Sequence, residues 1–257
     1  MSFIQLNGIN LNVEIRGEGP PLIFIHGLGC DHTQWNQEAA RLSSAFQTIV
    51  FDCRGHGKSD KPVYYSLHDH IQDVLALTDY FALHDIILYG SSMGSYIAQG
   101  TAIAQSQRIH KLILVAPKSN GLTSSTQWLF QEHAGELKTM DKQEKRMFFY
   151  RHMVYDPQLL VEHPDLLKST LTPKQKLAAN KALAGFDFRK GLPGITARTL
   201  VISGKYDGLN PPAEGQICAS LIPDSTFVEM QYSGHLPMYE EPDLYRSVID
   251  RFLFQTK

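Results

Sequence analysis

The chain contains few residues that would cross-link it or hold a metal cluster. It has three cysteines in 257 residues, Cys30, Cys53 and Cys218. They are too few and too scattered for a disulfide framework or a four-ligand zinc site. Reduced thiols are the simplest interpretation, and we expect a cytoplasmic protein that needs no metal or other cofactor.

The sequence also lacks an excess of charge and long hydrophobic runs. It has 24 lysines and arginines against 26 aspartates and glutamates, without a basic block. Nothing in this balance attracts a phosphate backbone, so we expect no nucleic-acid partner. No run approaches the roughly 20 apolar residues that span a bilayer, and the polar N-terminus lacks the apolar core of a signal peptide. We therefore expect no membrane partner.

Short apolar runs typical of buried strands are present, in a regular order. The first 16 residues alternate around Asn7-Gly8, which predicts a β-hairpin. Segments of helical length, such as 68–84, separate the early runs. This order predicts a parallel sheet with helices on both faces. The strands are predicted to begin near Pro21, Thr48, Asp85, Lys111 and Thr199, with a weaker one near Ser225.

The strand pattern stops after Pro117 and resumes near position 196. Residues 119–195 contain only helical segments, such as DKQEKRMFFYRHMVY and TPKQKLAANKALAGF, separated by proline-containing breaks. A chain of this length is sufficient for one large α/β domain. We predict an α/β core made of residues 1–118 and 196–257, with a helical cap, residues 119–195, inserted into it.

Two adjacent serines follow the apolar run from Asp85, and one of them fits a motif. The sequence GSSMG at positions 90–94 matches G-x-S-x-G only with Ser92 at its centre. Centring it on Ser91 would need glycine at positions 89 and 93, which are tyrosine and methionine. In this motif a strand turns sharply into a helix and exposes the central hydroxyl above the sheet. Ser92 is therefore the candidate nucleophile, although a lone motif of this kind also fits a helix N-cap.

A serine hydroxyl needs a base, and the base needs a carboxylate to orient it. His235 lies in a Gly-His turn between the last predicted strand and the final helix. Asp207 stands at the carboxyl end of a predicted strand, where parallel sheets place their active sites. The alternatives are that Asp207 is only a turn residue and His235 only structural. Glu214 would be a poor substitute acid because it falls inside the next predicted helix.

Stabilising a tetrahedral oxyanion takes two backbone N–H donors. One would be that of Met93, next to the nucleophile, and the other that of Leu28 in the loop HGLG, which follows an early strand. A backbone N–H donor puts no requirement on the side chain, so leucine and methionine are both compatible with this role. His26, at the start of that loop, is interpreted as a brace that holds it by hydrogen bonds.

The chain resembles the α/β-hydrolase fold proteins. HGLG, DCRGHGKSD, GSSMG, GKYDGLNPP and SGHLPMYEEP match the landmarks of that family in order, over essentially the whole length. The resemblance implies a mostly parallel, twisted, eight-stranded sheet with an inserted cap, and a serine nucleophile. Within the family the chain is similar to small lidded bacterial esterases, enol-lactonases and C–C bond hydrolases. We expect a serine hydrolase that acts on a small ester or lactone; C–C bond hydrolysis of a diketone and a non-hydrolytic ligand sensor stay open.

Other patterns are weaker. His68 and His70 are interpreted as a solvated helix start, because no third and fourth metal ligand stands at suitable spacing. A dinucleotide-binding motif fails at His32, where glycine is needed, and a P-loop fails at Asp52. Large side chains of the cap are expected to line the substrate pocket. The candidates are Trp128, Phe149, His152 and Met153.

Overall fold

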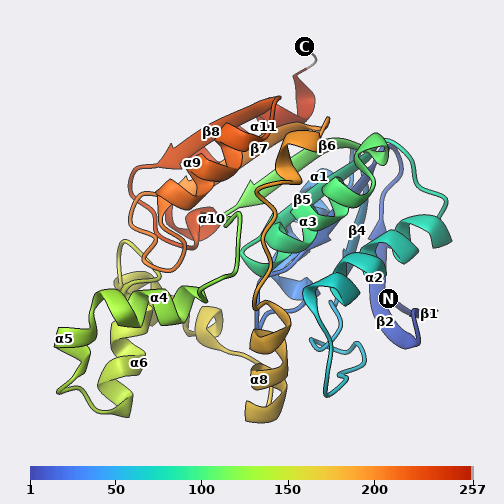
Figure 1. The fold of residues 1–257 in the computed structure, drawn as a ribbon. Helices are drawn as coiled ribbons and strands as arrows, with labels where there is room; N and C mark the ends of the chain where they lie inside the picture. Colours follow the sequence, from blue (N-terminus) through green and yellow to red (C-terminus); the bar gives the residue numbers. More distant parts are fainter. Residues whose placement is uncertain (256–257) are drawn as a thin grey trace.

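The architecture is an eight-stranded sheet with helices on both faces (Figure 1). We describe residues 1–255 of a computed structural model of the chain. The strand order is β1-β2-β4-β3-β5-β6-β7-β8, with β1, β2 and β4 antiparallel and all later pairs parallel. The predicted fold class is confirmed. The strands are β1 (Ser2–Leu6), β2 (Ile9–Arg16), β3 (Pro21–Ile25), β4 (Gln47–Phe51), β5 (Ile86–Ser91), β6 (Ile109–Val115), β7 (Arg198–Gly204) and β8 (Ser225–Met230).

The predicted hairpin at the N-terminus is present. Asn7 and Gly8 both have positive φ, 48° and 75°, as the tight turn of a two-residue hairpin requires. The turn pairs Leu6 with Ile9, and the antiparallel pairing of the two strands continues as far as Ser2 and Val13.

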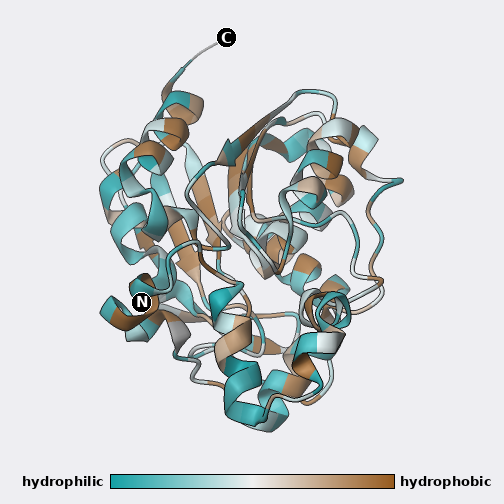
Figure 2. Cartoon of the chain, turned by 90° about the vertical axis from the view of Figure 1, so that its left-hand side faces the viewer, coloured by the Kyte–Doolittle hydropathy of each residue, from teal (hydrophilic) through white to brown (hydrophobic). Residues whose placement is uncertain are grey.

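Each sheet face has its own hydrophobic core, because successive strand residues point to opposite sides. In β3, Ile23 and Ile25 pack on one side, and Leu22 and Phe24 on the other. Both sets are buried, as is typical of a parallel sheet covered on two faces. Strands are largely brown and the outer sides of the helices teal in Figure 2. One face carries α2 (Leu67–Tyr80), α3 (Met93–Ala104) and α9 (Pro212–Leu221), and the other α1 (Asn36–Leu42) and α11 (Pro242–Phe254).

Residues 119–195, which we call the helical insert, lie between β6 and β7 along the chain. Figure 1 shows α4, α5, α6 and α8 beyond the end of the sheet. Leu129, Leu137 and Phe148 form a small core there, together with Leu209 from the loop after β7. The insert consists of α4 (Ser125–Glu132), α5 (Ala134–Leu137), α6 (Lys142–Arg151), α7 (Gln158–Glu162), η3 (Pro164–Leu167), α8 (Pro173–Ala182) and η4 (Leu192–Gly194).

Short helices complete the described part of the chain: η1 (His32–Trp35), η2 (Ser106–Arg108) and α10 (Pro237–Glu240). Within residues 1–255, no helix combines the length and the apolar character needed to cross a bilayer.

Candidate active site

Ser92 occupies a sharp turn between β5 and α3. Its backbone has φ 52° and ψ -117°, a conformation that a residue with a side chain rarely adopts. The turn is tight enough to require glycine on both sides. A Cβ at Gly90 would lie 2.2 Å from the carbonyl oxygen of Gly94, and a Cβ at Gly94 would lie 2.0 Å from that of Ile25. The spacing of GSSMG thus reflects two close backbone approaches.

The side chain of Ser92 does not cap the helix that follows. Ser92 stands at the N-cap position of α3, yet its hydroxyl accepts no hydrogen bond from the first turn. It lies 2.9 Å from Nε2 of His235 instead. The interpretation of Ser92 as only a helix cap therefore does not describe its side chain.

Three side chains distant in sequence form one hydrogen-bonded row. The Ser92 hydroxyl donates to Nε2 of His235 at 2.9 Å, and Nδ1 of His235 donates to Oδ2 of Asp207 at 2.7 Å. The other carboxylate oxygen accepts from the N–H groups of Leu209 and Asn210, both at 2.9 Å. All three predicted residues are brought together, whereas no hydrogen bond joins the alternative acid Glu214 to His235 within residues 1–255.

The surroundings of His235 raise its pKa, which makes the neutral imidazole a stronger base. Burial of the imidazole lowers its pKa, but the charge and hydrogen bond of Asp207, together with the charge of Glu240, outweigh that effect and raise the pKa above the ordinary 6.5. Glu240 also accepts from the N–H of Gly234 at 2.7 Å, so it holds the loop that carries the histidine. A hydroxyl bonded to such an imidazole has a base for its proton, and the carboxylate stabilises the resulting cation.

A cavity of about 350 Å³ opens beside this row. Ser92, His235, Leu28 and Met93 all line it. Met93 is the first residue of α3, so its N–H has no acceptor within the helix. Among the described residues, no hydrogen bond uses the N–H of Leu28 or of Met93. Both groups are thus left without an acceptor in the described part of the chain.

Hydrogen bonds of His26 hold the loop that carries Leu28. The N–H of Cys53 donates to Nε2 of His26 at 3.0 Å, which leaves the proton on Nδ1, and Nδ1 donates to the carbonyl oxygen of Gly27 at 2.8 Å. Burial lowers the pKa of His26, consistent with this neutral form. The N–H of Gly27 donates to Oε1 of Gln34 at 2.9 Å. These contacts confirm His26 as a brace.

Two of the four expected pocket residues line the cavity, Phe149 and Met153. Trp128 packs against the core of the insert, and the ring of His152 stacks on Phe148 at a centroid distance of 4.0 Å. The expectation for Trp128 and His152 is corrected, because both half-buried side chains pack on other residues of the insert and do not line the cavity.

The cavity wall also contains residues that the sequence analysis did not predict. Lys118, Tyr150 and Phe186 line the cavity, as do Leu171, Lys176 and Asn180. Lys118 could have been predicted from its position, because it directly follows the strand predicted from Lys111. Active sites occur at this edge of a parallel sheet.

The insert also contacts the active-site loops through its backbone. The carbonyl oxygen of Met153 accepts from the N–H of His235, and that of His152 accepts from the N–H of Gly208 at 2.9 Å. A Cβ at Gly234 would lie 2.4 Å from the carbonyl oxygen of Met153. The residues after α6 are therefore packed directly on the loops that carry the acid and the imidazole.

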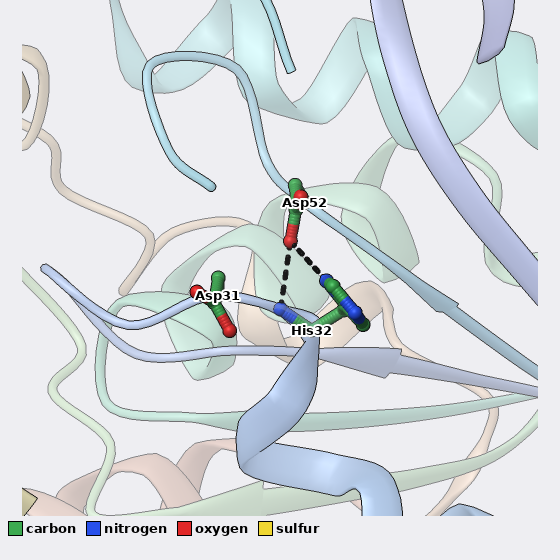
Figure 3. A group of neighbouring side chains, drawn as sticks. All are labelled: Asp31, His32 and Asp52. Atoms are coloured by element: carbon green, nitrogen blue, oxygen red, sulfur yellow. Dashed lines mark hydrogen bonds and ion pairs between the residues drawn. The ribbon is translucent and has the colours of Figure 1, made fainter. Parts of the chain in front are cut away.

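A separate group, Asp31, His32 and Asp52, has the residue types of a metal site (Figure 3). One oxygen of Asp52 accepts from both the N–H and Nδ1 of His32, at 2.8 and 2.6 Å. Its other oxygen accepts from Nδ2 of Asn12 and the N–H of Lys58, at 2.9 and 2.7 Å. Asp31 caps η1. The carboxylate oxygens of Asp52 and Nδ1 of His32 therefore already have hydrogen-bond partners, whereas the buried Nε2 of His32 has none among the described residues.

The interpretation of His68 and His70 as a solvated helix start holds for one of them. His68 is exposed, but His70 is buried, with its ring 5.3 Å from that of Tyr65. The prediction of a solvent-exposed side chain is wrong for His70, because His56 and Tyr65 of the preceding loop pack against its ring.

Comparison with known proteins gives consistent similarities. A sequence model of the alpha/beta hydrolase fold matches residues 20–242. The chain is 28% identical to 3-oxoadipate enol-lactonase 1 of Acinetobacter baylyi, over 96% of this chain and 94% of that one. The enol-lactonase of Burkholderia xenovorans superposes with a TM-score of 0.84 at 26% identity, covering 99% of this chain and 100% of that one. A thermophilic esterase of Thermogutta terrifontis gives a TM-score of 0.82 at 26% identity, covering 98% of each chain.

Proposed function

The chain belongs to the α/β-hydrolase fold family, and from this premise we propose that it is a serine hydrolase that cleaves a small carboxylic ester or lactone through an acyl-enzyme. The observation that carries the proposal is the hydrogen-bonded row of Ser92, His235 and Asp207 beside a cavity. The similarity to enol-lactonases and an esterase supports the same class of substrate.

In the proposed first step, Oγ of Ser92 attacks the carbonyl carbon and its proton passes to Nε2 of His235. Asp207 stays ionised and accepts the Nδ1–H bond, which stabilises the imidazolium. The N–H groups of Leu28 and Met93 bind the oxyanion of the tetrahedral intermediate. Removing one such donor typically costs about 3 to 4 kcal/mol of transition-state stabilisation.

The imidazolium then donates its proton to the leaving oxygen, and the C–O bond of the ester breaks. With a lactone, the released hydroxyl stays attached to the acyl chain. Water attacks the acyl-enzyme, gives its proton to Nε2 of His235, and Ser92 leaves as the hydroxyl. The helical insert acts in this proposal as a cap, since its residues Phe149 and Met153 line the same cavity as the serine.

The test combines covalent labelling with turnover. We expect a fluorophosphonate to label Ser92, and a series of p-nitrophenyl esters of rising acyl length to be hydrolysed. Ser92→Ala should abolish labelling and lower kcat by about a million-fold. Ser91→Ala is the matched control and should keep both. Folded protein that resists labelling would contradict the proposal, and cleavage of a vinylogous diketone without ester turnover would indicate a C–C bond hydrolase.

A further inference from the structure

Lys118 lines the cavity, and its ammonium group is bound to no carboxylate among residues 1–255. It follows β6, its residue is 7% exposed, and Nζ donates to the carbonyl oxygen of Thr123 at 3.0 Å. Within residues 1–255 no ion pair includes Lys118. Two of its three N–H groups therefore have no acceptor from the described chain.

The rest of the wall is positive or neutral. The described lining residues include no aspartate or glutamate, while lysine occurs there three times. Lys168 is paired with Asp165, so its charge is compensated. Lys176, on α8, has no such partner among residues 1–255. The cavity thus has an uncompensated positive side, and Lys118 is its most buried cation.

A buried cation is costly unless it is paired. Burial lowers the pKa of Lys118, while the charges of Glu214 and Asp207 act in the opposite direction. Neither carboxylate lies within ion-pair distance of Nζ, and Oδ2 of Asp207 is already bonded to His235. Backbone contacts keep Lys118 in place, since Nε2 of Gln99 donates to its carbonyl oxygen at 3.1 Å.

We propose that Lys118 binds a carboxylate on the acyl part of the substrate, so that the preferred ester or lactone carries a negative charge. This inference rests on the proposed function, because it assigns a substrate to the same cavity. Lys118 would then set specificity without taking part in the bond-breaking steps. A purely structural role, holding Thr123 through its carbonyl, would give no preference between charged and neutral substrates.

The experiment compares two ester substrates that differ only at the far end. One is the mono-p-nitrophenyl ester of adipic or suberic acid, and the other is its carboxamide counterpart. We expect kcat/KM to favour the carboxylate by about tenfold or more, as a charge-assisted bond allows. Lys118→Met should reduce that ratio to about one, through a higher KM for the carboxylate alone. Lys174→Met, which removes an exposed lysine of α8 that does not line the cavity, should leave the ratio unchanged.

Binding to Ser92→Ala protein separates this inference from the proposed function. Titration calorimetry with monomethyl adipate and its carboxamide counterpart, which differ only at the far end, needs no turnover and leaves Lys118 intact. Tighter binding of the carboxylate ligand, with no hydrolysis of any ester by the wild-type protein, would support the anion site and contradict the hydrolase. Equal affinity for the two ligands would overturn the role of Lys118 even if Lys118→Met failed to fold. A carboxylate preference that survives in folded Lys118→Met would overturn it as well.

Discussion

The backbone N–H of His235 donates a hydrogen bond to the carbonyl oxygen of Met153, so a residue of the helical insert holds the loop that carries the imidazole. The same segment holds the loop of the acid, because the carbonyl oxygen of His152 accepts from Gly208. Both loops come from the sheet, and neither contact involves a side chain of the insert. The position of the insert and the geometry of the Ser92 row are therefore coupled.

Because of this coupling, we expect that adding one methyl group at Gly234 strongly lowers activity. Gly234→Ala would place a Cβ 2.4 Å from the carbonyl oxygen of Met153, which has little freedom to move. We expect kcat to fall by about 100-fold, because a misplacement of about 1 Å has that effect at an active site. Steady-state hydrolysis of a p-nitrophenyl ester measures it, with circular dichroism to check folding.

The matched control is Gly194→Ala, because nothing lies within 4 Å of a Cβ built at that glycine and its φ is not positive. It should retain the activity of the wild-type protein. If Gly234→Ala were folded and equally active, the insert would not control the position of the imidazole.

The second prediction concerns pH. His235 must be neutral to accept a proton, so kcat/KM should fall as the pH drops through the raised pKa of this residue, above 6.5. Glu240 contributes to that rise. Glu240→Gln should therefore lower the pKa of His235 and move the acid limb to lower pH.

A pH profile of kcat/KM for the wild-type and variant proteins measures the displacement. The control is Glu132→Gln, which removes an equal charge from an exposed position on α4. An acid limb that stays in place, or moves to higher pH, in Glu240→Gln would show that this carboxylate does not act on the imidazole.

The sequence was informative where a functional residue depends on local backbone geometry. Gly90 and Gly94 are needed because each faces a carbonyl oxygen at a distance that excludes a Cβ, and this need selects Ser92. Asp207 and His235 follow from a general rule for the carboxyl ends of parallel strands. Short sequence motifs are therefore enough to predict these residues.

The wall of the cavity was less predictable because it depends on how short helices pack. The aromatic run at 148–150 does not say which ring faces the serine. Phe149 and Tyr150 line the cavity, whereas Phe148 is buried in the insert's core. His152 contributes a carbonyl group rather than its ring, and nothing in the residue type indicates that.

A stability prediction follows from a buried ion pair between α2 and the loop after β4. Arg54 donates from Nε and from a terminal nitrogen to the two carboxylate oxygens of Asp73, at 2.8 and 2.6 Å, and both residues are buried. Removing one partner leaves an unpaired buried charge. We expect Asp73→Asn to lower the free energy of unfolding by about 3 to 5 kcal/mol, measured by urea denaturation. Asp165→Ala, which breaks the exposed pair with Lys168, should leave the midpoint of urea denaturation unchanged. If both substitutions destabilised the protein equally, burial of the Arg54–Asp73 pair would not account for its effect.

The last prediction concerns the cluster of Asp31, His32 and Asp52. A metal bound through Nδ1 of His32 would have to displace the bond from that nitrogen to Asp52, at 2.6 Å, and any metal bound to Asp52 would compete with the donors on its oxygens. Breaking such bonds to a buried carboxylate costs about 1.5 to 3 kcal/mol each. We therefore expect EDTA to leave ester turnover and Tm unchanged, and equimolar Zn²⁺ or Mg²⁺ not to raise Tm. A Tm that rises with added metal, and no longer does so in Asp31→Ala, would instead identify these residues as a metal site.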